Sequence, residues 1–397
     1  MLSTFHPDLQ GHSSVTYFFT SERKVDIYSH LATLPESHPL VKNLGVGDIF
    51  IYPPLAYFTL GVARTLLSPL ENANFTPWMW EHLDNLNSFP TFHFQIFLLK
   101  APYLLVDLLA AVFLAKMFTK EINQKRAFIL WLFNPLTLYS TFMLGQLDIL
   151  PTFFVILALY LAKKRRYSIS LIALGIGGSY KMFPLLLILP AAFLFSDNFK
   201  QRIKNVLIGF APFVLTIVPF LGSTAFRQMV LFSPKSQKML FMTWPVSGAE
   251  GVYPFIFILC LVYLLAFYRK GTKVLAYYFL AILLLIYSVT HYHPQWFLWV
   301  TPLFVIDLVR SKFANLLPLI VLFGCWLTLT LLFEPSLSYG MFYPLLPDLK
   351  HASGLTEILA LYTDVFKLKS LVRSIFAASA LFYAFDTFTR KIRLKAQ

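Results

Sequence analysis

The chain has 397 residues, of which 57% are hydrophobic, 17% aromatic and only 13% charged, with a mean hydropathy of +0.66. This composition lies outside the range of soluble globular proteins and indicates a polytopic membrane protein. The net charge of +14 does not indicate nucleic-acid binding, because the basic residues gather in short segments between apolar runs. The only cysteines, Cys260 and Cys325, lie inside apolar runs, which excludes a disulfide framework and a CxxC site.

Residues 1–93 contain no long apolar run, and we expect them to form an outer loop of the membrane protein. The stretch 51–67 is apolar enough for a span, but counting it as one would invert every later loop against the charge pattern. We therefore expect an interfacial helix at 51–67, and a second amphipathic segment at 76–93.

Residues 94–397 are expected to form an all-α multipass transmembrane domain. Three of the apolar runs, at 149–162, 167–180 and 182–196, are short for a full crossing. The predicted spans, about eleven in this chain, lie near 94–118, 127–144, 149–162, 167–180, 182–196, 205–222, 251–268, 273–290, 296–309, 313–333 and 368–388.

The loops between these spans differ in charge from one side to the other. The basic loops hold most of the 33 lysine and arginine residues and are assigned to the cytoplasm. An odd number of spans then leaves Met1 outside, although residues 1–50 carry no apolar run that would export them. We expect a further helix upstream of the first residues; the alternative is that one short predicted span is false. The basic loops are 116–126, 163–166, 197–204, 268–273, 310–312 and 389–397.

Two polar groups lie at the outer ends of short predicted helices. The first is Gly145-Gln146-Leu147-Asp148, where Asp148 is placed to act as a helix N-cap or as a site residue. The second is Lys181, which follows the glycine pair Gly177-Gly178 and precedes an apolar run. A lysine there suits phosphate binding, and snorkelling to the interface is the alternative interpretation.

The segment His291-Tyr292-His293-Pro294-Gln295-Trp296 forms a third group on the same outer side. Two histidines two residues apart suit hydrogen bonding to phosphate or ligation of a metal, but HxH without a third ligand is a weak metal signal. No cofactor is firmly indicated, a divalent metal being the one alternative. Tyr292 and Trp296 are also explained as membrane-interface anchors.

Acidic residues of the outer segment are candidates for a general base. Asp8, Asp26 and Asp48 share the outer compartment with Asp148 and Lys181.

Taken in order along the chain, these motifs resemble the GT-C superfamily of integral-membrane glycosyltransferases, and within it the polyprenyl-phosphate-sugar-dependent mannosyltransferase-like enzymes. The likeness rests on the Gly-Gln-x-Asp motif, the basic turn after it, the glycine-rich helix before Lys181, and the upstream Tyr52-Pro53-Pro54-Leu55. It covers residues 5–195 well, and the last third only through residues 293–296.

The resemblance implies an inverting glycosyltransferase that moves a hexose, with mannose favoured, from a polyprenyl-phosphate carrier to a lipid-linked or other acceptor on the outer face. It implies Asp8 as the catalytic base, standing after the helix expected upstream. The remaining candidates would bind the substrate through phosphate or sugar hydroxyls: Gln146, Asp148, Lys181, Arg227, His291, His293 and Gln295, with Lys235 and Lys238 as further candidates for phosphate.

Two other classes remain open at this point. A transporter or flippase of lipid-linked sugars would favour internal repeats and mid-membrane charges; no repeat is evident, and Lys100 and Asp107 form one pair on a helix face. A lipid-linked glycan ligase or polymerase would share the outer-facing site. In each case the partners are membrane lipids and not nucleic acid, and a prokaryotic cytoplasmic membrane with an outward-facing site is expected.

Overall fold

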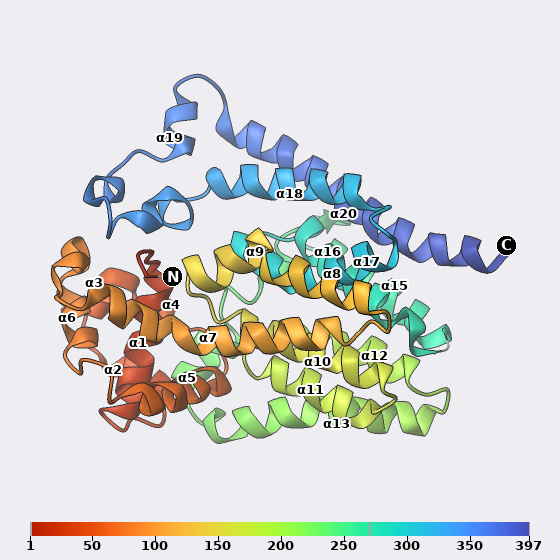
Figure 1. Ribbon diagram of the computed structural model, residues 1–397, viewed down its shortest axis with the longest axis horizontal. Helices are drawn as coiled ribbons and strands as arrows, with labels where there is room; N and C mark the ends of the chain where they lie inside the picture. Colours follow the sequence, from red (N-terminus) through yellow and green to blue (C-terminus); the bar gives the residue numbers. More distant parts are fainter. Residues whose placement is uncertain (1, 270, 397) are drawn as a thin grey trace.

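The computed structural model describes residues 2–269 and 271–396, with side chains described as far as residue 387. Lys270, in the predicted basic loop 268–273, lies outside the described residues. The described chain is helical except for turns, loops and one short hairpin. Figure 1 shows the long helices running side by side, with α1 to α6 and α19 at one end and the loops that carry the basic segments at the other.

The first ninety residues fold into short helices that pack on one another. Proline opens α1, α3 and α5, where its missing N–H costs no hydrogen bond. Gly11 lets α1 approach the end of α4, because a Cβ at this position would lie 2.3 Å from the carbonyl oxygen of Ile49. The elements are α1 (Pro7–Thr20), α2 (Ile27–Thr33), α3 (Pro39–Leu44), α4 (Val46–Ile49), α5 (Pro54–Leu67), α6 (Phe75–Glu81) and the 3-10 helix η1 (Leu83–Ser88).

The next part of the chain forms the central bundle. Helix α11 packs against both α10 and α13, and a Cβ on Gly175 would lie 2.1 Å from the carbonyl oxygen of Gly209. Glycines thus allow the backbones of α11 and α13 to touch. The elements are α7 (Phe92–Ala115), α8 (Glu121–Leu132), α9 (Pro135–Thr137), the π-helix η2 (Leu138–Met143), α10 (Ile149–Lys163), α11 (Tyr167–Gly178), η3 (Phe183–Leu187), α12 (Ile188–Leu194), α13 (Phe199–Ile217) and η4 (Val218–Phe220).

The last part adds a buried helix, α16, and an outer pair, α18 and α20, that lies over it. Its elements are α14 (Thr224–Phe226), the π-helix η5 (Arg227–Leu231), η6 (Lys238–Leu240), β1 (Trp244–Pro245), β2 (Gly251–Val252), α15 (Pro254–Tyr268), η7 (Thr272–Val274), α16 (Leu275–Val289), η8 (Pro294–Trp299), α17 (Thr301–Arg310), α18 (Leu316–Leu331), η9 (Pro335–Leu337), η10 (Tyr339–Phe342), η11 (Pro347–Lys350), α19 (Leu355–Ala360) and α20 (Val365–Ala396). Strands β1 and β2 pair antiparallel.

Among the described residues, four helices are long and apolar enough to cross a membrane: Phe92–Ala115, Phe199–Phe220, Thr272–Val289 and Val365–Thr387. Five further apolar helices are shorter, at Ile149–Lys163, Tyr167–Gly178, Phe183–Leu194, Pro254–Tyr268 and Leu316–Leu331. The predicted all-α class is confirmed, but the count of eleven spans is not.

Prolines explain two of the differences from the predicted spans. The expected span 127–144 ends at Leu132 and resumes as irregular helix at Pro135, after Asn134 has capped the new turn. The expected span 296–309 is a 3-10 turn opened by Pro294, followed by the ten residues of α17. At these two positions the helix stops before the proline, which lacks a backbone N–H, and hydropathy alone does not register such a break.

The central helices α7 and α10 run in the same direction and end level at the basic end. Lys163, at the end of α10, donates hydrogen bonds to the carbonyl oxygens of Lys116 (3.2 Å) and Met117 (2.8 Å), just after α7. Helix α7 has 24 residues and α10 has 15. The opposite end of α10, where Asp148 lies, is therefore recessed relative to the start of α7.

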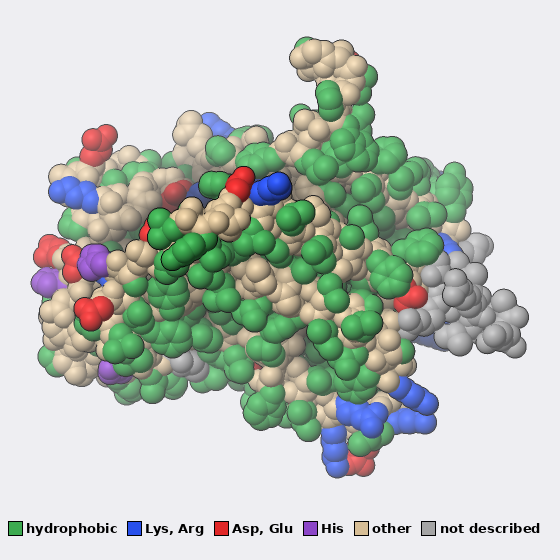
Figure 2. Space-filling view, turned by 90° about the horizontal axis from the view of Figure 1, so that it is seen from above, with side chains coloured by type: hydrophobic (Ala, Val, Ile, Leu, Met, Phe, Trp, Pro, Cys, Tyr) green, Lys and Arg blue, Asp and Glu red, His purple; other side chains and the backbone are tan. Residues whose placement is uncertain are grey.

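Charged side chains are gathered at the two ends of the molecule. Figure 2 shows hydrophobic side chains over the middle of the visible face, His and acidic side chains at the end formed by the first helices, and a Lys and Arg cluster toward the opposite end. This distribution is typical of a protein whose middle lies in lipid.

Candidate functional site

A cavity of about 580 Å³ opens where the first helices meet the segment that follows α11, the 3-10 helix η8 and the segment 231–239. Its wall combines ionisable groups, aromatic rings and aliphatic side chains from segments far apart in the sequence. The residues that line it are His6, Asp8, His12, Asn43, Leu44, Asp48, Ile49, Ile51, Tyr52, Pro53, Lys181, Met182, Phe183, Leu186, Leu231, Ser233, Lys235, Ser236, Lys238, Met239, His293, Gln295, Trp296, Trp299, Glu334 and Leu337.

Asp8 lies in the first turn of α1 and is held from two directions. The side chain of His6 caps this helix by accepting a hydrogen bond from the Asp8 backbone N–H (3.2 Å), and its ring nitrogen is 3.7 Å from the carboxylate. Gln146 Nε2 donates to Asp8 Oδ2 at 2.6 Å. The Asp8 side chain remains 36% exposed, so its carboxylate is fixed but accessible from the cavity.

Lys181 lies in an aromatic box behind which Asp148 is fully buried. Its Nζ is 2.8 Å from Asp148 Oδ1 and lies 5.1–5.4 Å from the ring centres of Tyr52, Trp296 and Trp299. The indole N–H of Trp299 donates to the same oxygen of Asp148. Asp148 stands at the N-cap position of α10 but makes no capping hydrogen bond, so its carboxylate serves the lysine and the indole instead.

The segment that runs from the end of η5 into η6 brings two more lysines to the cavity wall. Lys235 pairs with Asp48 at 2.5 Å. Lys238 Nζ lies 2.8 Å from His293 Nε2 and 5.6 Å from the ring centre of Trp296.

Burial and neighbouring charges shift the protonation of this wall. Burial, together with the positive charge of Lys238, lowers the pKa of His293 to about 3, and burial lowers the pKa of His12 to about 4. Both imidazoles are therefore neutral at pH 7. Burial raises the pKa of Asp8, but the neighbouring His6 and His12 and the hydrogen bond from Gln146 outweigh it, so the pKa lies below its ordinary value. The carboxylate is ionised at pH 7.

Several buried acceptor atoms beside the cavity have no hydrogen-bond partner among the described residues. They are Gln146 Oε1, Asp148 Oδ2 and Gln295 Oε1. His6 Nε2 is also unpartnered, and it is a donor, since Nδ1 accepts from the Asp8 N–H. Buried polar atoms are satisfied in most proteins, so a group of orphaned ones indicates a ligand or ordered water. Acceptors, ammonium donors and the stacked rings of Trp296 and Trp299, 5.0 Å apart, together suit a polar head group with hydroxyls and an anionic charge.

The structure brings most of the predicted site residues together. Asp8, Lys181, His293 and Gln295 line the cavity, and Gln146 and Asp148 contact two of them.

Two other predicted residues lie away from the cavity. Arg227 is turned back onto its own segment, donating to the carbonyl oxygen of Leu221 (2.5 Å) and to Thr224 (3.0 Å). His291 is exposed and lies beside Phe333.

The expected pairing of Lys100 with Asp107 is wrong. Lys100 donates to the carbonyl oxygens of Thr4 and Met143, whereas Asp107 accepts from the indole N–H of Trp131. Lys100 thus contacts the segment before α1 and the end of η2, whereas Asp107 contacts α8.

Sequence reasoning missed His12, Trp299 and Glu334 as cavity residues. His12 lies in a segment that offers no motif, and Glu334 follows a long apolar run without a neighbouring signal. Trp299 is three residues beyond Trp296, which is one turn of a 3-10 helix, and this spacing was the available clue.

The metal interpretation of the two histidines is not supported by their surroundings. His293 Nε2 is occupied by Lys238, an ammonium that would repel a cation. Among the described residues, no group of three or more His, Cys, Asp or Glu side chains is arranged to hold a metal ion.

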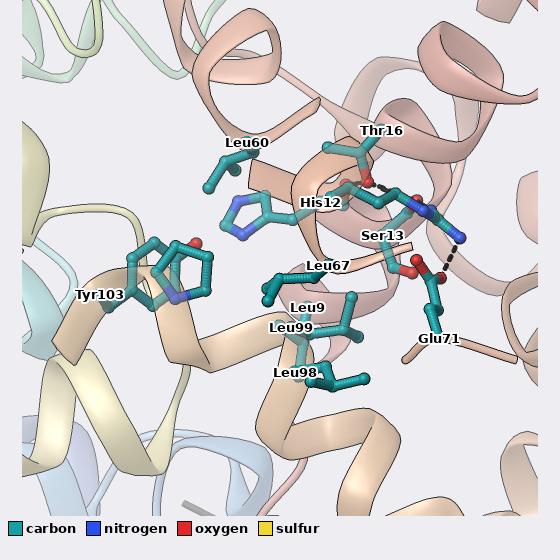
Figure 3. Close-up of a pocket in the computed structure, with 12 residues that line it drawn as sticks. Leu9, His12, Ser13, Thr16, Leu60, Leu67, Glu71, Leu98, Leu99 and Tyr103 are labelled. Carbon is teal, nitrogen blue, oxygen red and sulfur yellow. Dashed lines mark hydrogen bonds and ion pairs between the residues drawn. The ribbon is translucent and has the colours of Figure 1, made fainter. Parts of the chain in front are cut away.

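A second polar cluster lies on the other side of α1, around a small cavity of about 30 Å³ (Figure 3). Arg64 donates to the carbonyl oxygen of Ser13 (2.8 Å) and to Thr76 (3.0 Å), and forms an ion pair with Glu71. Figure 3 shows Ser13, Thr16 and Glu71 gathered on one side, with leucines and Tyr103 across from them. His12 lines both cavities, so α1 is the wall between them.

The fold and the site define a helical, multipass membrane protein with an amphipathic cavity at the end opposite its basic loops. Residues 68–247 match the model of the family described as GPI transamidase subunit PIG-U, and over these residues the chain is similar to that family. No curated protein matches the chain.

This similarity corrects several expectations. The match is to a transamidase subunit and not to a glycosyltransferase, so the predicted sugar transfer, the enzyme class and the polyprenyl-phosphate donor are wrong. The Gly-Gln-x-Asp motif and the interfacial lysine are short patterns, and they also occur where residues only stabilise a fold. Asp148 and Lys181, for example, form an ion pair with each other. An integral membrane protein is supported; a prokaryotic membrane and an outward-facing active site are not.

Proposed function

We propose that the chain is a lipid-binding membrane subunit of a complex of the GPI transamidase type, and that its cavity receives the head group of the glycolipid. The observation that carries this proposal is the coincidence of the matched region with one wall of the cavity. Residues 68–247 include Asp148, Lys181, Lys235 and Lys238.

The chemistry of the wall supports a glycolipid rather than a free sugar. One part is aliphatic, formed by Leu186, Leu231, Met239 and Leu337, and another part carries charges and indole rings. Sugars stack their apolar faces on indole rings and exchange hydrogen bonds with carboxylates and amides through their hydroxyls. An amphipathic wall of this kind suits a molecule that has both a sugar head and acyl chains.

The position of the cavity suggests its side of the membrane and a role for the first residues. The basic loops lie at the opposite end of the bundle, so by the positive-inside rule the cavity faces away from the cytoplasm. In this proposal residues 1–93 form a cap that contributes Asp8, His12 and Asp48, and residues 94–397 form the membrane domain beneath it.

The test is attachment of a glycolipid anchor to a reporter protein in cells that lack the chain. We expect anchoring to be lost, to return with the wild-type chain, and to be reduced at least fivefold with Trp296→Ala or Asp8→Asn at equal expression. The control Lys125→Ala, on the exposed face of α8, restores anchoring fully. Unchanged anchoring without the chain, or sugar transfer by the purified chain, would contradict the proposal.

A further inference from the structure

Three ammonium groups converge on one cavity from two segments, and two of them are matched by carboxylates. Lys181 is paired with Asp148 at 2.8 Å, and Lys235 with Asp48 at 2.5 Å. No ion pair joins Lys238 to a carboxylate of the described residues, and its close partner is the neutral ring of His293.

The loop that carries Lys238 is held in place by its own hydrogen bonds. Ser236 donates its hydroxyl to the carbonyl oxygen of Ser233 at 2.8 Å, and the Lys235 backbone N–H donates to the Ser233 hydroxyl at 3.3 Å. Lys235 lies in the turn that leads into η6, and Lys238 is the first residue of η6. The two cations lie close enough to repel each other, and only Lys235 has a carboxylate partner among the described residues.

Burial and charge act together on Lys238. Burial, followed by the charges of Lys235 and Lys181, lowers its pKa to about 8, and attraction from Asp48 and Glu334 does not restore the ordinary value. The ammonium is still mainly protonated at pH 7, so a half-buried positive charge without an anionic partner faces the cavity. A bound oxyanion would relieve both the desolvation and the repulsion.

We propose that Lys238, with Lys235 beside it, forms a subsite for a phosphate group of the lipid head group. Trp296 and the carboxylate of Asp8 then hold the hydroxyl-bearing part of the same head group. The inference rests on the proposed function, in which the cavity takes a lipid. Three carboxylates line the same cavity. Asp48 is already paired with Lys235, and Asp8 is held by Gln146 and His6. Glu334 attracts Lys238, but no ion pair joins the two among the described residues, so the ammonium keeps room for an anion.

The test measures lipid binding to the full chain by native mass spectrometry from a polyoxyethylene detergent, which carries neither sugar nor phosphate. The probes are phosphatidylinositol, a glucosyl diacylglycerol with the same acyl chains, and inorganic phosphate. The variants are Lys238→Met, Lys238→Arg and the control Lys200→Met, an exposed lysine at the start of α13. Thermal unfolding of each variant verifies that it is folded.

We expect wild type to bind phosphatidylinositol about tenfold more tightly than the neutral glycolipid, since one charge-assisted contact contributes about that factor. Lys238→Met should remove this preference and leave neutral glycolipid binding unchanged, while Lys238→Arg and Lys200→Met keep it. Millimolar inorganic phosphate should weaken phosphatidylinositol binding to wild type and not to Lys238→Met.

The remaining outcomes separate the failures. Equal preference in wild type and Lys238→Met would overturn the phosphate subsite and leave the proposed function standing. Binding of inorganic phosphate without any preference between the two lipids would assign the subsite to a soluble anion and overturn the lipid assignment. Wild type that binds neither lipid would count against the proposed function itself.

Discussion

Helix α1 separates two polar clusters that differ in how many of their polar atoms have hydrogen-bond partners. On one side the guanidinium of Arg64 is surrounded by Ser13, Thr76 and Glu71, all within hydrogen-bonding distance. On the other side the 580 Å³ cavity has orphaned acceptors and a lysine without a carboxylate. A guanidinium held by several partners of its own chain stabilises the fold, whereas a group of polar atoms without partners is arranged for a ligand or for ordered water.

The largest expected effect on stability is at the ion pair between Arg64 and Glu71. Arg64→Leu leaves the largely buried carboxylate of Glu71 without its partner and should lower the free energy of unfolding by about 3–5 kcal/mol. Thermal unfolding in detergent measures this. Adding Glu71→Leu should recover part of the loss, because replacing both charges removes the unpaired one; a single variant as stable as wild type would show that the pair contributes little.

The ion pair between Lys181 and Asp148 is expected to stabilise the fold and also to take part in ligand binding. Lys181→Met strands the fully buried Asp148 with the indole of Trp299 and should cost about 3 kcal/mol of stability. The double variant Lys181→Met, Asp148→Asn should unfold nearer to the wild-type temperature while binding of glycolipid stays lost. Recovery of binding in the double variant would instead show that Lys181 is purely structural.

Acid should destabilise the cavity side through His12. Its folded pKa is about 4, below the ordinary 6.5, so the neutral ring contributes stability that is complete above pH 6.5 and is lost as the pH falls toward 4. From these values the loss at pH 5 is about 2 kcal/mol. Unfolding temperatures between pH 7 and pH 5 measure it. His12→Gln should make the profile less steep without removing it, because the lowered pKa of His293, about 3, contributes a similar loss. A profile as steep as that of wild type would show that His12 does not contribute.

Asp8→Asn should separate binding from folding. Its side chain is 36% exposed, so we expect a change in stability below about 1 kcal/mol. Glycolipid binding should weaken about tenfold, because a carboxylate that accepts from a hydroxyl becomes a neutral amide. If glycolipid binding were unaltered and the free energy of unfolding fell strongly, Asp8 would stabilise the fold and not bind the ligand.

The smallest effect is expected at the surface of α8. Lys125 pairs with Glu121 at 2.9 Å, but both side chains are mostly exposed. Lys125→Ala should change the free energy of unfolding by no more than about 0.5 kcal/mol and leave lipid binding intact. A larger change would indicate that this face contacts another protein.

The sequence predicts the long spans well because they depend only on local composition. Helices α7, α13, α16 and α20 each contain an apolar run long enough to be recognised on its own. The break at Asn134-Pro135 was missed because an apolar run continues through it. Hydropathy averages over such a break, although the proline removes a backbone donor there.

The candidate site was predictable only in part. The positions of Gln146, Asp148 and Lys181 followed from the ends of helices, which the charge pattern orders along one side. The contact between Asp8 and Gln146 joins residues 138 positions apart, and no local pattern encodes it. The predicted sugar transfer was wrong for a related reason. The short motifs on which it rested indicate where helices end, and they do not determine which reaction takes place there.

The unequal lengths of α7 and α10 have a consequence for the bilayer. The two helices end level at Lys163, and nine fewer residues make α10 about 14 Å shorter at the other end, at 1.5 Å per residue. Asp148, at the start of α10, therefore lies deeper in the bundle than the residue at which α7 begins. If α7 crosses the bilayer over its full length, a lipid that reaches the level of Asp148 carries its polar head into the hydrocarbon layer, and local thinning of the membrane then contributes to its affinity. Thinner bilayers should then favour occupancy without any change in the protein.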